Sequence, residues 1–305
     1  MHHAVVFAAV VLSLMGCENS PKFRENLGTT NRRISFDEFK RTIYQEPDTG
    51  IYIVDGDIPI ANEDKLRAYY DRTTSHEGAL IVGNWSGGGP GQDSKWDDNE
   101  KRRITYCVNA VSFGEHYNRV VEHITGAHVV WENTFANFSF IYRYDHDYNC
   151  TTNNYNVVFN VRRVSGQPYW ARAFFPDDPR QAREILIDDS ALPDPAGPIS
   201  LFGVLEHELG HVLGFRHEHI RPEAKPEGEC KEDGFFRKLT TYDAQSVMHY
   251  PHCKGSNTGD WDLTLDDTNG AVFLYGIGPA PISCYEDPFS CPEGMSCWDH
   301  VCELN

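Results

Sequence analysis

Residues 207–217 read His-Glu-Leu-Gly-His-Val-Leu-Gly-Phe-Arg-His, which is the pattern H-E-x-x-H-x-x-G-x-x-H. His207 and His211 are four residues apart, so on a helix they lie one turn above each other on the same face. Two imidazoles in that arrangement can bind one Zn²⁺ ion. Glu208 follows the first histidine, so it lies beside the ligand face and can hold a water molecule without filling a ligand position. The segment therefore predicts a helix that carries a metal site.

The second half of the pattern supplies a third ligand. Gly214 can adopt the left-handed conformation that ends a helix without steric cost. The chain can then turn and bring His217 back to the metal. Three protein ligands leave one position open for water, which is typical of a catalytic zinc site and not of a structural one. A bare H-E-x-x-H occurs by chance in unrelated helices, but the added glycine and histidine make this pattern far more specific.

A second segment strengthens this prediction. Ser246-Val247-Met248-His249-Tyr250, with the form S-x-M-H-Y, and Glu218 directly after the third histidine both resemble the astacins, a branch of the metzincin zinc metallopeptidases. The resemblance implies that Met248 lies beneath the zinc and that Tyr250 approaches the metal and stabilises the oxyanion. It also implies an α+β fold of the metzincin type, with a mixed twisted sheet and an active-site helix. The run His207-Glu208-Leu209-Gly210-His211 is also similar to bacterial metallopeptidases with H-E-I-G-H, so the subfamily stays open.

The run Ala171-Arg172-Ala173-Phe174-Phe175-Pro176 is similar to the edge strand of matrixins, on which a substrate pairs as an added β-strand. Its proline fits the end of an edge strand. The metzincin resemblance also implies mostly irregular chain after Gly214. The sequence pattern predicts strands over 51–54, 103–108, 138–144, 155–164 and 183–188, helices over 35–44, 62–72 and 113–125, and a zinc helix capped by Ser200 that runs to about Leu213.

The N-terminus has the features of a targeting segment. The apolar run from Ala4 to Met15 is shorter than the roughly 20 residues that a membrane-spanning helix needs. Leu14-Met15-Gly16-Cys17 resembles the lipobox of bacterial lipoproteins, in which the signal is removed before the cysteine and the cysteine is acylated. An ordinary secretory signal is the alternative, since no Lys or Arg precedes the apolar run. Both interpretations predict export, either to the bacterial cell envelope with membrane attachment through a lipidated Cys17, or into the medium.

The cysteine count agrees with an oxidising compartment. Nine cysteines less Cys17 leave eight, an even number that suits disulfides. Four of these lie in the main part of the chain, and their proximity in sequence favours the pairs Cys107–Cys150 and Cys230–Cys253. The other four crowd the last residues and predict a small disulfide-rich module, since no C-x₂-C spacing supports zinc there; they are Cys284, Cys291, Cys297 and Cys302.

Charge and length limit the partners and the domains. The 305-residue chain has a formal net charge of −18 at pH 7. This acidic balance disfavours nucleic acid as a partner, so we expect protein or peptide substrates. The expected division is a signal peptide over 1–16, a propeptide-like segment over 17–80, a metzincin catalytic domain over 81–279 and a Cys-rich module over 280–305.

The propeptide-like segment contains a candidate latency motif. Val54-Asp55-Gly56-Asp57-Ile58 resembles the F-x-G-D motif of astacin propeptides, in which the aspartate binds the zinc and displaces the water. A carboxylate can serve as a fourth zinc ligand, so the resemblance implies that Asp57 blocks the site until the segment is removed. The alternative is an Asp-Gly turn between a strand and a loop.

Together these features predict an exported zinc-dependent endopeptidase, in which a zinc-activated water attacks the peptide bond and Glu208 is the general base. Two other functions remain: a non-catalytic zinc-binding surface protein, and a zinc amidase that acts on cell-wall peptides. Glu208 argues against the first, because loss of the glutamate is the usual mark of a decayed site. A structural calcium ion near Asp145-His146-Asp147 is a further alternative, but the spacing there matches no calcium-binding loop.

Overall fold

The computed structural model describes residues 35–54, 56–73, 93–192, 199–230, 236–257, 261–278, 295–298 and 301–304. The signal segment 1–16, Cys17 and most of the cysteine-rich module lie outside these residues. The proposed lipidation site and the pairing of the last four cysteines therefore stay predictions.

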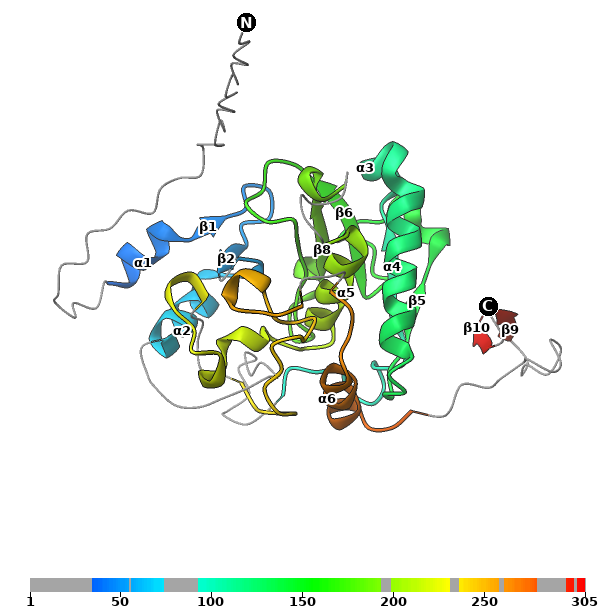
Figure 1. Cartoon of the computed structure of the whole chain (residues 1–305). Coiled ribbons are helices and arrows are strands. Elements are labelled where there is room, and N and C mark those ends of the chain that lie inside the picture. Colours follow the sequence, from blue (N-terminus) through cyan, green and yellow to red (C-terminus); the bar gives the residue numbers. More distant parts are fainter. Residues whose placement is uncertain are drawn as a thin grey trace, which may run out of the picture. The chain divides into compact units, whose positions relative to one another are not determined.

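A mixed five-stranded sheet with the order β5-β4-β6-β8-β7 forms the centre of the described chain (Figure 1). The strands β5, β4, β6 and β8 run parallel to one another, and β7 pairs antiparallel with β8 at the edge. All five residues of β8 are buried, as expected for a parallel strand that is covered on both faces. The strands are β4 (Ile104–Val108), β5 (Phe140–Tyr142), β6 (Phe159–Val164), β7 (Ala171–Arg172) and β8 (Glu184–Asp188).

Two long helices, α4 (Tyr117–Glu132) and α5 (Leu201–Val212), pack against each other and share one apolar cluster with the sheet. Trp131 joins the two helices, because its indole N–H donates to the carbonyl of Glu206 at 2.8 Å. The helix expected over 113–125 starts earlier, as α3 (Ala110–Phe113), and α4 continues to Glu132. Gly114, with φ of 55°, separates α3 from the turn that leads into α4.

The N-terminal segment, residues 36–73, forms a small sheet. One helix precedes this sheet in the sequence and another follows it. Its strands are antiparallel in the order β1-β2-β3. One apolar cluster joins this segment to Phe175, and a second joins it to Tyr169, Ala182 and Leu186. The segment therefore packs on the main sheet at two places. Its elements are α1 (Phe36–Thr42), β1 (Tyr44–Gln45), β2 (Tyr52–Val54), β3 (Ile58–Ile60) and α2 (Glu63–Thr73).

After α5 the chain is largely irregular, as expected, but the prediction missed one helix, α6 (Leu265–Tyr275). A capping box begins α6, because the side chain of Thr264 and that of Asp267 each accept a hydrogen bond from the other's backbone N–H. At the C-terminal end, β9 (Met295–Trp298) and β10 (Val301–Leu304) form an antiparallel hairpin. Short 3₁₀ turns lie at Gly114–His116, Tyr144–Asn149, Arg180–Ala182, Asp189–Ala191, Glu218–Ile220, Pro222–Ala224, Gly228–Cys230 and Pro251–Cys253.

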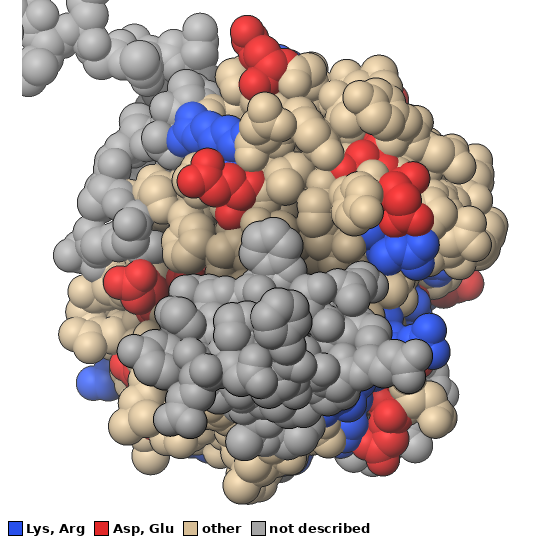
Figure 2. Space-filling model, turned by 90° about the vertical axis from the view of Figure 1, so that its right-hand side faces the viewer, with Lys and Arg blue, Asp and Glu red and all other residues tan. Residues whose placement is uncertain are grey.

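Both disulfides expected in the main part of the chain are present. Cys107 is bonded to Cys150, and Cys230 is bonded to Cys253. The mixed sheet, the helices packed on it and these bridges confirm the predicted α+β fold class. Among the residues described, no helix is long and apolar enough to cross a membrane. On the face shown in Figure 2, acidic and basic side chains of the described residues are interspersed.

Candidate metal centre

Helix α5 begins and ends where its sequence predicts. The side chain of Ser200 accepts a hydrogen bond from the backbone N–H of Gly203 at 3.2 Å and so caps the first turn. At the other end Gly214 has φ of 95°, and the N–H of Phe215 reaches back to the carbonyl of Gly210 at 2.9 Å. A Cβ atom on Gly214 would lie 2.0 Å from the carbonyl oxygen of Ser94. The turn therefore requires glycine for two reasons: its backbone φ is positive, and there is no room for a side chain.

This turn brings the third histidine to the first two. His207, His211 and His217 are all fully or almost fully buried, and their ligand atoms and a carboxylate oxygen of Asp57 all lie within 4.8 Å of one another. Nε2 of His217 lies 3.2 Å from Nε2 of His207 and 3.2 Å from Oδ1 of Asp57. The carboxylate of Asp57 lies 3.5 Å from Nε2 of His207 and 3.8 Å from Nε2 of His211.

The outer nitrogens of the helix histidines are held by backbone carbonyls. Nδ1 of His207 donates to the carbonyl of Val247, and Nδ1 of His211 donates to that of Phe215, each at 2.8 Å. The proton is therefore on Nδ1, and the lone pair of Nε2 faces the centre of the cluster. Nε2 of His211 and Oδ1 of Asp57 are buried without a hydrogen-bond partner. Buried polar atoms without partners that converge on one point fit a metal ion, and imidazole nitrogens suit zinc.

Glu208 lies beside this cluster, and its oxygen atoms are not among the ligand atoms. The side chain is buried, one of its oxygens has no hydrogen-bond partner, and it accepts a hydrogen bond from the backbone N–H of Ala173. Burial, reinforced by the charge of Asp57, raises the pKa of Glu208 well above its usual value. For Asp57, burial by itself would raise the pKa, but the surrounding histidine side chains, His217 above all, hold it well below its usual value.

Tyr250 and Met248 lie where the resemblance places them, near the cluster. The ring centroids of Tyr250 and His217 lie 4.3 Å apart. The hydroxyl of Tyr250 donates a hydrogen bond to Oδ2 of Asp57. Met248 packs under the helix so closely that a Cβ on Gly210 would lie 2.3 Å from its sulfur. The structure therefore brings together every residue predicted for the site except Cys17, which lies outside the described residues.

One residue of this site was not predicted. The indole of Trp261 stacks on the imidazole of His207, with ring centroids 4.7 Å apart and an angle of 9° between the planes. Its N–H donates to the carbonyl of His249 at 3.3 Å. Trp261 has φ of 62°, a backbone conformation that bulky residues rarely adopt. No spacing rule could have found it, because it reaches the site from an irregular loop.

A cavity of about 690 Å³ opens beside the cluster. Its wall joins Ala171 of β7, and Tyr169 and Trp170 directly before this strand, to the α5 residues His207 and Glu208. The other lining residues come from the N-terminal segment, from the loop before α5 and from the chain after it; they are Gly56, Asp57, Pro168, Ile199, Val204, Tyr250, Pro251, His252 and Trp261. The cleft is therefore largely apolar and lies along β7, but Asp57 occupies its polar end.

The structure gives no support to a calcium site near Asp145 and Asp147. The carboxylate of Asp147 accepts hydrogen bonds from the N–H of Val108 and from two tyrosine hydroxyls, and Asp145 is paired with Arg143. Among the described residues, one other group has ligand atoms close enough to hold a metal, namely Cys230, His252 and Cys253. Its two cysteines are joined in a disulfide.

No protein-family model matches the chain, but parts of it are similar to curated proteins. The zinc metalloproteinase nas-39 of Caenorhabditis elegans is 32% identical over 93 residues, which cover 24% of this chain and 10% of that protein. Bone morphogenetic protein 1 of Xenopus laevis is 32% identical over 94 residues, which cover 26% of this chain and 13% of that protein. The astacin-like metalloendopeptidase of Coturnix japonica is 38% identical over 74 residues, covering 19% and 18%. The chain thus spans less than a fifth of the length of each of these relatives.

Among solved structures, the chain matches high choriolytic enzyme 1, a hatching enzyme zinc-protease of Oryzias latipes, with a TM-score of 0.40 and 18% identity. That alignment covers 64% of this chain and 98% of the other. Over about a quarter of its length, the sequence is therefore similar to zinc metalloproteinases of the astacin type. The predicted family resemblance is supported at this level, whereas the bacterial lipoprotein type stays a prediction.

Proposed function

We propose that this protein is an exported zinc-dependent endopeptidase. The observation that carries the proposal is the convergence of three buried histidine Nε2 atoms on one point, with Glu208 beside them and a cleft along the edge strand. The sequence similarity to zinc metalloproteinases supports the same assignment.

In this proposal His207, His211 and His217 hold the zinc ion through Nε2. When bound, zinc acidifies water and polarises the scissile carbonyl. Glu208 takes the proton of the attacking water and later passes it to the leaving amine. Its carboxylate is suited to this because the N–H of Ala173 fixes one side of it while one oxygen has no protein partner.

The substrate would lie extended along β7, which is a short edge strand with one side unpaired by the main sheet. Backbone hydrogen bonds to such an edge can align a peptide with the cleft. Tyr250 would donate a hydrogen bond to the developing oxyanion, because its hydroxyl already points at a carboxylate in the centre of the cluster.

We also propose that the N-terminal segment keeps the enzyme latent. Asp57 contributes the fourth ligand atom of the buried cluster and is itself buried. A zinc ion bound by the three histidines and by this carboxylate would have no position left for water. Activation would require a cut between about Arg72 and Lys95 and departure of the segment.

The test of the activity is Glu208→Gln in protein activated by limited proteolysis. Turnover of a peptide library should fall by about 10²- to 10⁴-fold, the usual contribution of a general base, while zinc content by atomic absorption stays at one ion per chain. Glu115→Gln is the matched control, since Glu115 is 90% exposed. Near-normal cleavage by Glu208→Gln would show that the glutamate is not the general base. Activity that survives a chelator would show that the reaction does not depend on a metal ion.

Export is the second part of the proposal. Two disulfides in the described chain favour an oxidising compartment. Labelled fatty acid should be incorporated into the wild-type protein and not into Cys17→Ser. Export without labelling of either protein would identify an ordinary secretory signal.

A further inference from the structure

A disulfide ties the turn that follows Tyr250 to the segment that follows the third histidine. Its two cysteines are buried, since Cys230 is 8% exposed and Cys253 is 4% exposed. The bond joins the 3₁₀ turn Gly228–Cys230 to the 3₁₀ turn Pro251–Cys253. The chain between the two cysteines contains Tyr250. The disulfide therefore closes a loop around the residue that faces the histidine cluster.

The backbone of Tyr250 is hydrogen-bonded directly to the turn that carries Cys253. Its carbonyl accepts a hydrogen bond from the N–H of Cys253 at 3.0 Å and another from that of Gly255 at 3.2 Å. Gly255 lies so close that a Cβ on it would be 2.8 Å from the same carbonyl oxygen. A further link crosses the loop, because the ammonium of Lys254 donates to the carbonyl of Lys225 at 2.9 Å. The backbone position of Tyr250 therefore depends on the turn that the disulfide fixes.

The ring of Tyr250 is connected to the disulfide through His252. The sulfur atoms of Cys230 and Cys253 and a ring nitrogen of His252 all lie within 4.8 Å of one another. The imidazole of His252 stacks on the ring of Tyr250, with ring centroids 5.1 Å apart and an angle of 26° between the planes. Tyr250 and His252 both line the cavity beside the histidine cluster. A continuous series of contacts therefore runs from the disulfide to the cleft.

The surrounding chain contains little regular structure that could position this side chain. Between α5 and α6 the described residues form short 3₁₀ turns and irregular chain, without an α-helix or a strand. Loops of this kind open more easily than packed helices and strands unless cross-links restrain them. The hydroxyl of Tyr250 is also bound by Asp57 of the N-terminal segment. Departure of that segment would remove this restraint and leave a larger share of the positioning to the disulfide.

We propose that the disulfide Cys230–Cys253 positions Tyr250 for oxyanion stabilisation, so that loss of the bond lowers turnover by displacing the tyrosine. The inference rests on the proposed function for the role of Tyr250. A displacement of about 1 Å in an active site can cost about 10²-fold in rate, and one oxyanion donor contributes about 10²- to 10³-fold. The two cysteines touch no reacting atom, so both are positioning residues. Their effect by this route is limited to what the hydroxyl of Tyr250 contributes.

The first test is a double-mutant cycle in protein activated by limited proteolysis. Cys230→Ser/Cys253→Ser should lower kcat by about ten-fold, with KM and zinc content unchanged. In the background of Tyr250→Phe, the same two substitutions should change kcat by less than about two-fold, because the hydroxyl that the disulfide positions is already absent. Equal losses of kcat in the two backgrounds would overturn the proposal, since they would mean that the disulfide acts on the whole structure and not through Tyr250.

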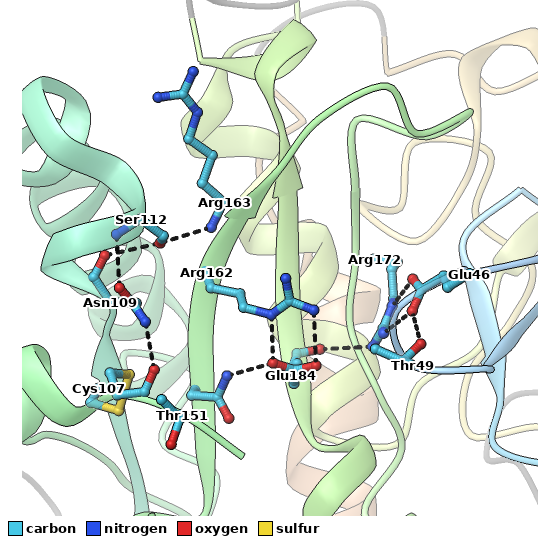
Figure 3. Close-up of polar contacts among 12 residues, drawn as sticks. Glu46, Thr49, Cys107, Asn109, Ser112, Thr151, Arg162, Arg163, Arg172 and Glu184 are labelled. Carbon is cyan, nitrogen blue, oxygen red and sulfur yellow. Dashed lines mark hydrogen bonds and ion pairs between the residues drawn. A yellow bond between two sulfur atoms is a disulfide. The ribbon is translucent and has the colours of Figure 1, made fainter. Parts of the chain in front are cut away.

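The other disulfide of the described chain is the matched control. Cys107 of β4 is bonded to Cys150, and the side-chain amide of Asn109 donates to the carbonyl of Cys150 at 2.8 Å (Figure 3). The structure describes both cysteines, and neither lines the cavity beside the histidine cluster. Cys107→Ser/Cys150→Ser should lower the melting temperature. It should change kcat by the same factor with and without the hydroxyl of Tyr250, because no contact leads from this bond to the tyrosine.

The second test uses the uncut chain and requires no peptidase activity. Hydrogen exchange at the amide of Gly255 reports on its bond to the carbonyl of Tyr250. This exchange should be at least about ten-fold faster in Cys230→Ser/Cys253→Ser than in the wild type, while exchange in α5 stays the same. If the variant does not fold, the wild type is compared before and after treatment with a dithiol, which is oxidised to its cyclic disulfide while Cys230 and Cys253 become thiols.

The two tests separate the disulfide from the peptidase activity. Unchanged exchange at Gly255 after loss of the bond would overturn the positioning role, whatever the activity of the protein. If the activated wild type cuts no peptide at all, the proposed peptidase function fails. The exchange measurement then still decides whether the disulfide fixes the turn next to Tyr250.

Discussion

The hydroxyl of Tyr250 donates its hydrogen bond to the carboxylate of Asp57. One residue belongs to the turn beneath the metal site, and the other belongs to the N-terminal segment. The tyrosine that we expect to assist an oxyanion is therefore paired with a carboxylate from the same chain. The N-terminal segment thus contacts two parts of the site through one carboxylate, the histidine cluster and Tyr250.

We expect Asp57→Ala to raise the peptidase activity of the uncut protein. Asp57 is the residue of the N-terminal segment that lies within ligand distance of all three histidines. If Asp57→Ala weakens the binding of the N-terminal segment to the site by about 1.4 kcal/mol, the ratio of chains with the segment released to chains with the segment bound rises about ten-fold. Activity on a fluorogenic peptide, measured before and after limited proteolysis, checks this. Asp64→Ala on the exposed face of α2 is the control. Equal activity of the uncut wild type and Asp57→Ala would remove the latency proposal.

Tyr250→Phe should act mainly on turnover. In protein freed of its N-terminal segment, kcat should fall by about 10²-fold, the usual effect of one missing oxyanion donor, while KM changes little. Tyr242→Phe removes a hydroxyl that bonds to His249 at 3.0 Å, and it serves as the control. A rise in KM with unchanged kcat would assign Tyr250 to substrate binding instead.

Gly214→Ala should destabilise the protein more than Gly166→Ala. Both glycines have positive φ, of 95° and 71°, so each substitution carries the conformational cost of about 1–2 kcal/mol. Only at Gly214 would the new Cβ meet backbone, since Ser94 lies 2.0 Å away and nothing lies within 4 Å at Gly166. Urea unfolding measures the difference. Zinc content should also fall in Gly214→Ala alone, because the turn presents His217. Equal costs at both sites would mean that Ser94 moves freely.

Glu46 and Arg172 form a buried ion pair (Figure 3), which should make stability fall in acid. Burial by itself would raise the pKa of Glu46, but the hydrogen bonds and charge of Arg172, with hydrogen bonds from Thr49 and Tyr169, place it below the ordinary 4.5. A carboxylate whose pKa is lowered on folding stabilises the protein above its unfolded pKa, and this contribution is lost as the pH falls through the folded pKa.

The free energy of unfolding of Glu46→Gln should therefore lie below that of the wild type at pH 7, and the gap should narrow as the pH falls below about 4.5. Urea titrations at pH 7, 5 and 3.5 measure the gap. Glu63→Gln, which removes an exposed partner of Lys40, should show a small gap throughout. A gap for Glu46→Gln that stays constant down to pH 3.5 would contradict the lowered pKa.

The clustering of the three histidines was predictable because its information is local. The offsets within residues 207–217 fix which side chains share a helix face, and Gly214 marks where the helix ends. Asp57 was predictable through a short motif, although its contact with the histidines depends on the packing of the whole N-terminal segment. The two disulfides followed from the proximity of their cysteines in the chain.

Other features depended on contacts between distant parts of the chain. Helix α6 was missed, although Thr264 and Asp267 form a capping box, because the family resemblance favoured irregular chain there. Trp261 reaches His207 through a loop with a rare backbone conformation. Arg172 was assigned only to an edge strand, since its burial depends on Glu46, a residue far away in sequence.

The close approach of Met248 to Gly210 has a consequence for how this site can change. A methyl group at position 210 would lie 2.3 Å from the methionine sulfur and 3.2 Å from the ring of Trp131. The second variable residue of H-E-x-x-H and the methionine of the turn therefore share one volume, although neither needs to touch the metal. Substitutions at these two positions should be tolerated as compensating pairs, with any gain in size on the helix matched by a smaller side chain in the turn.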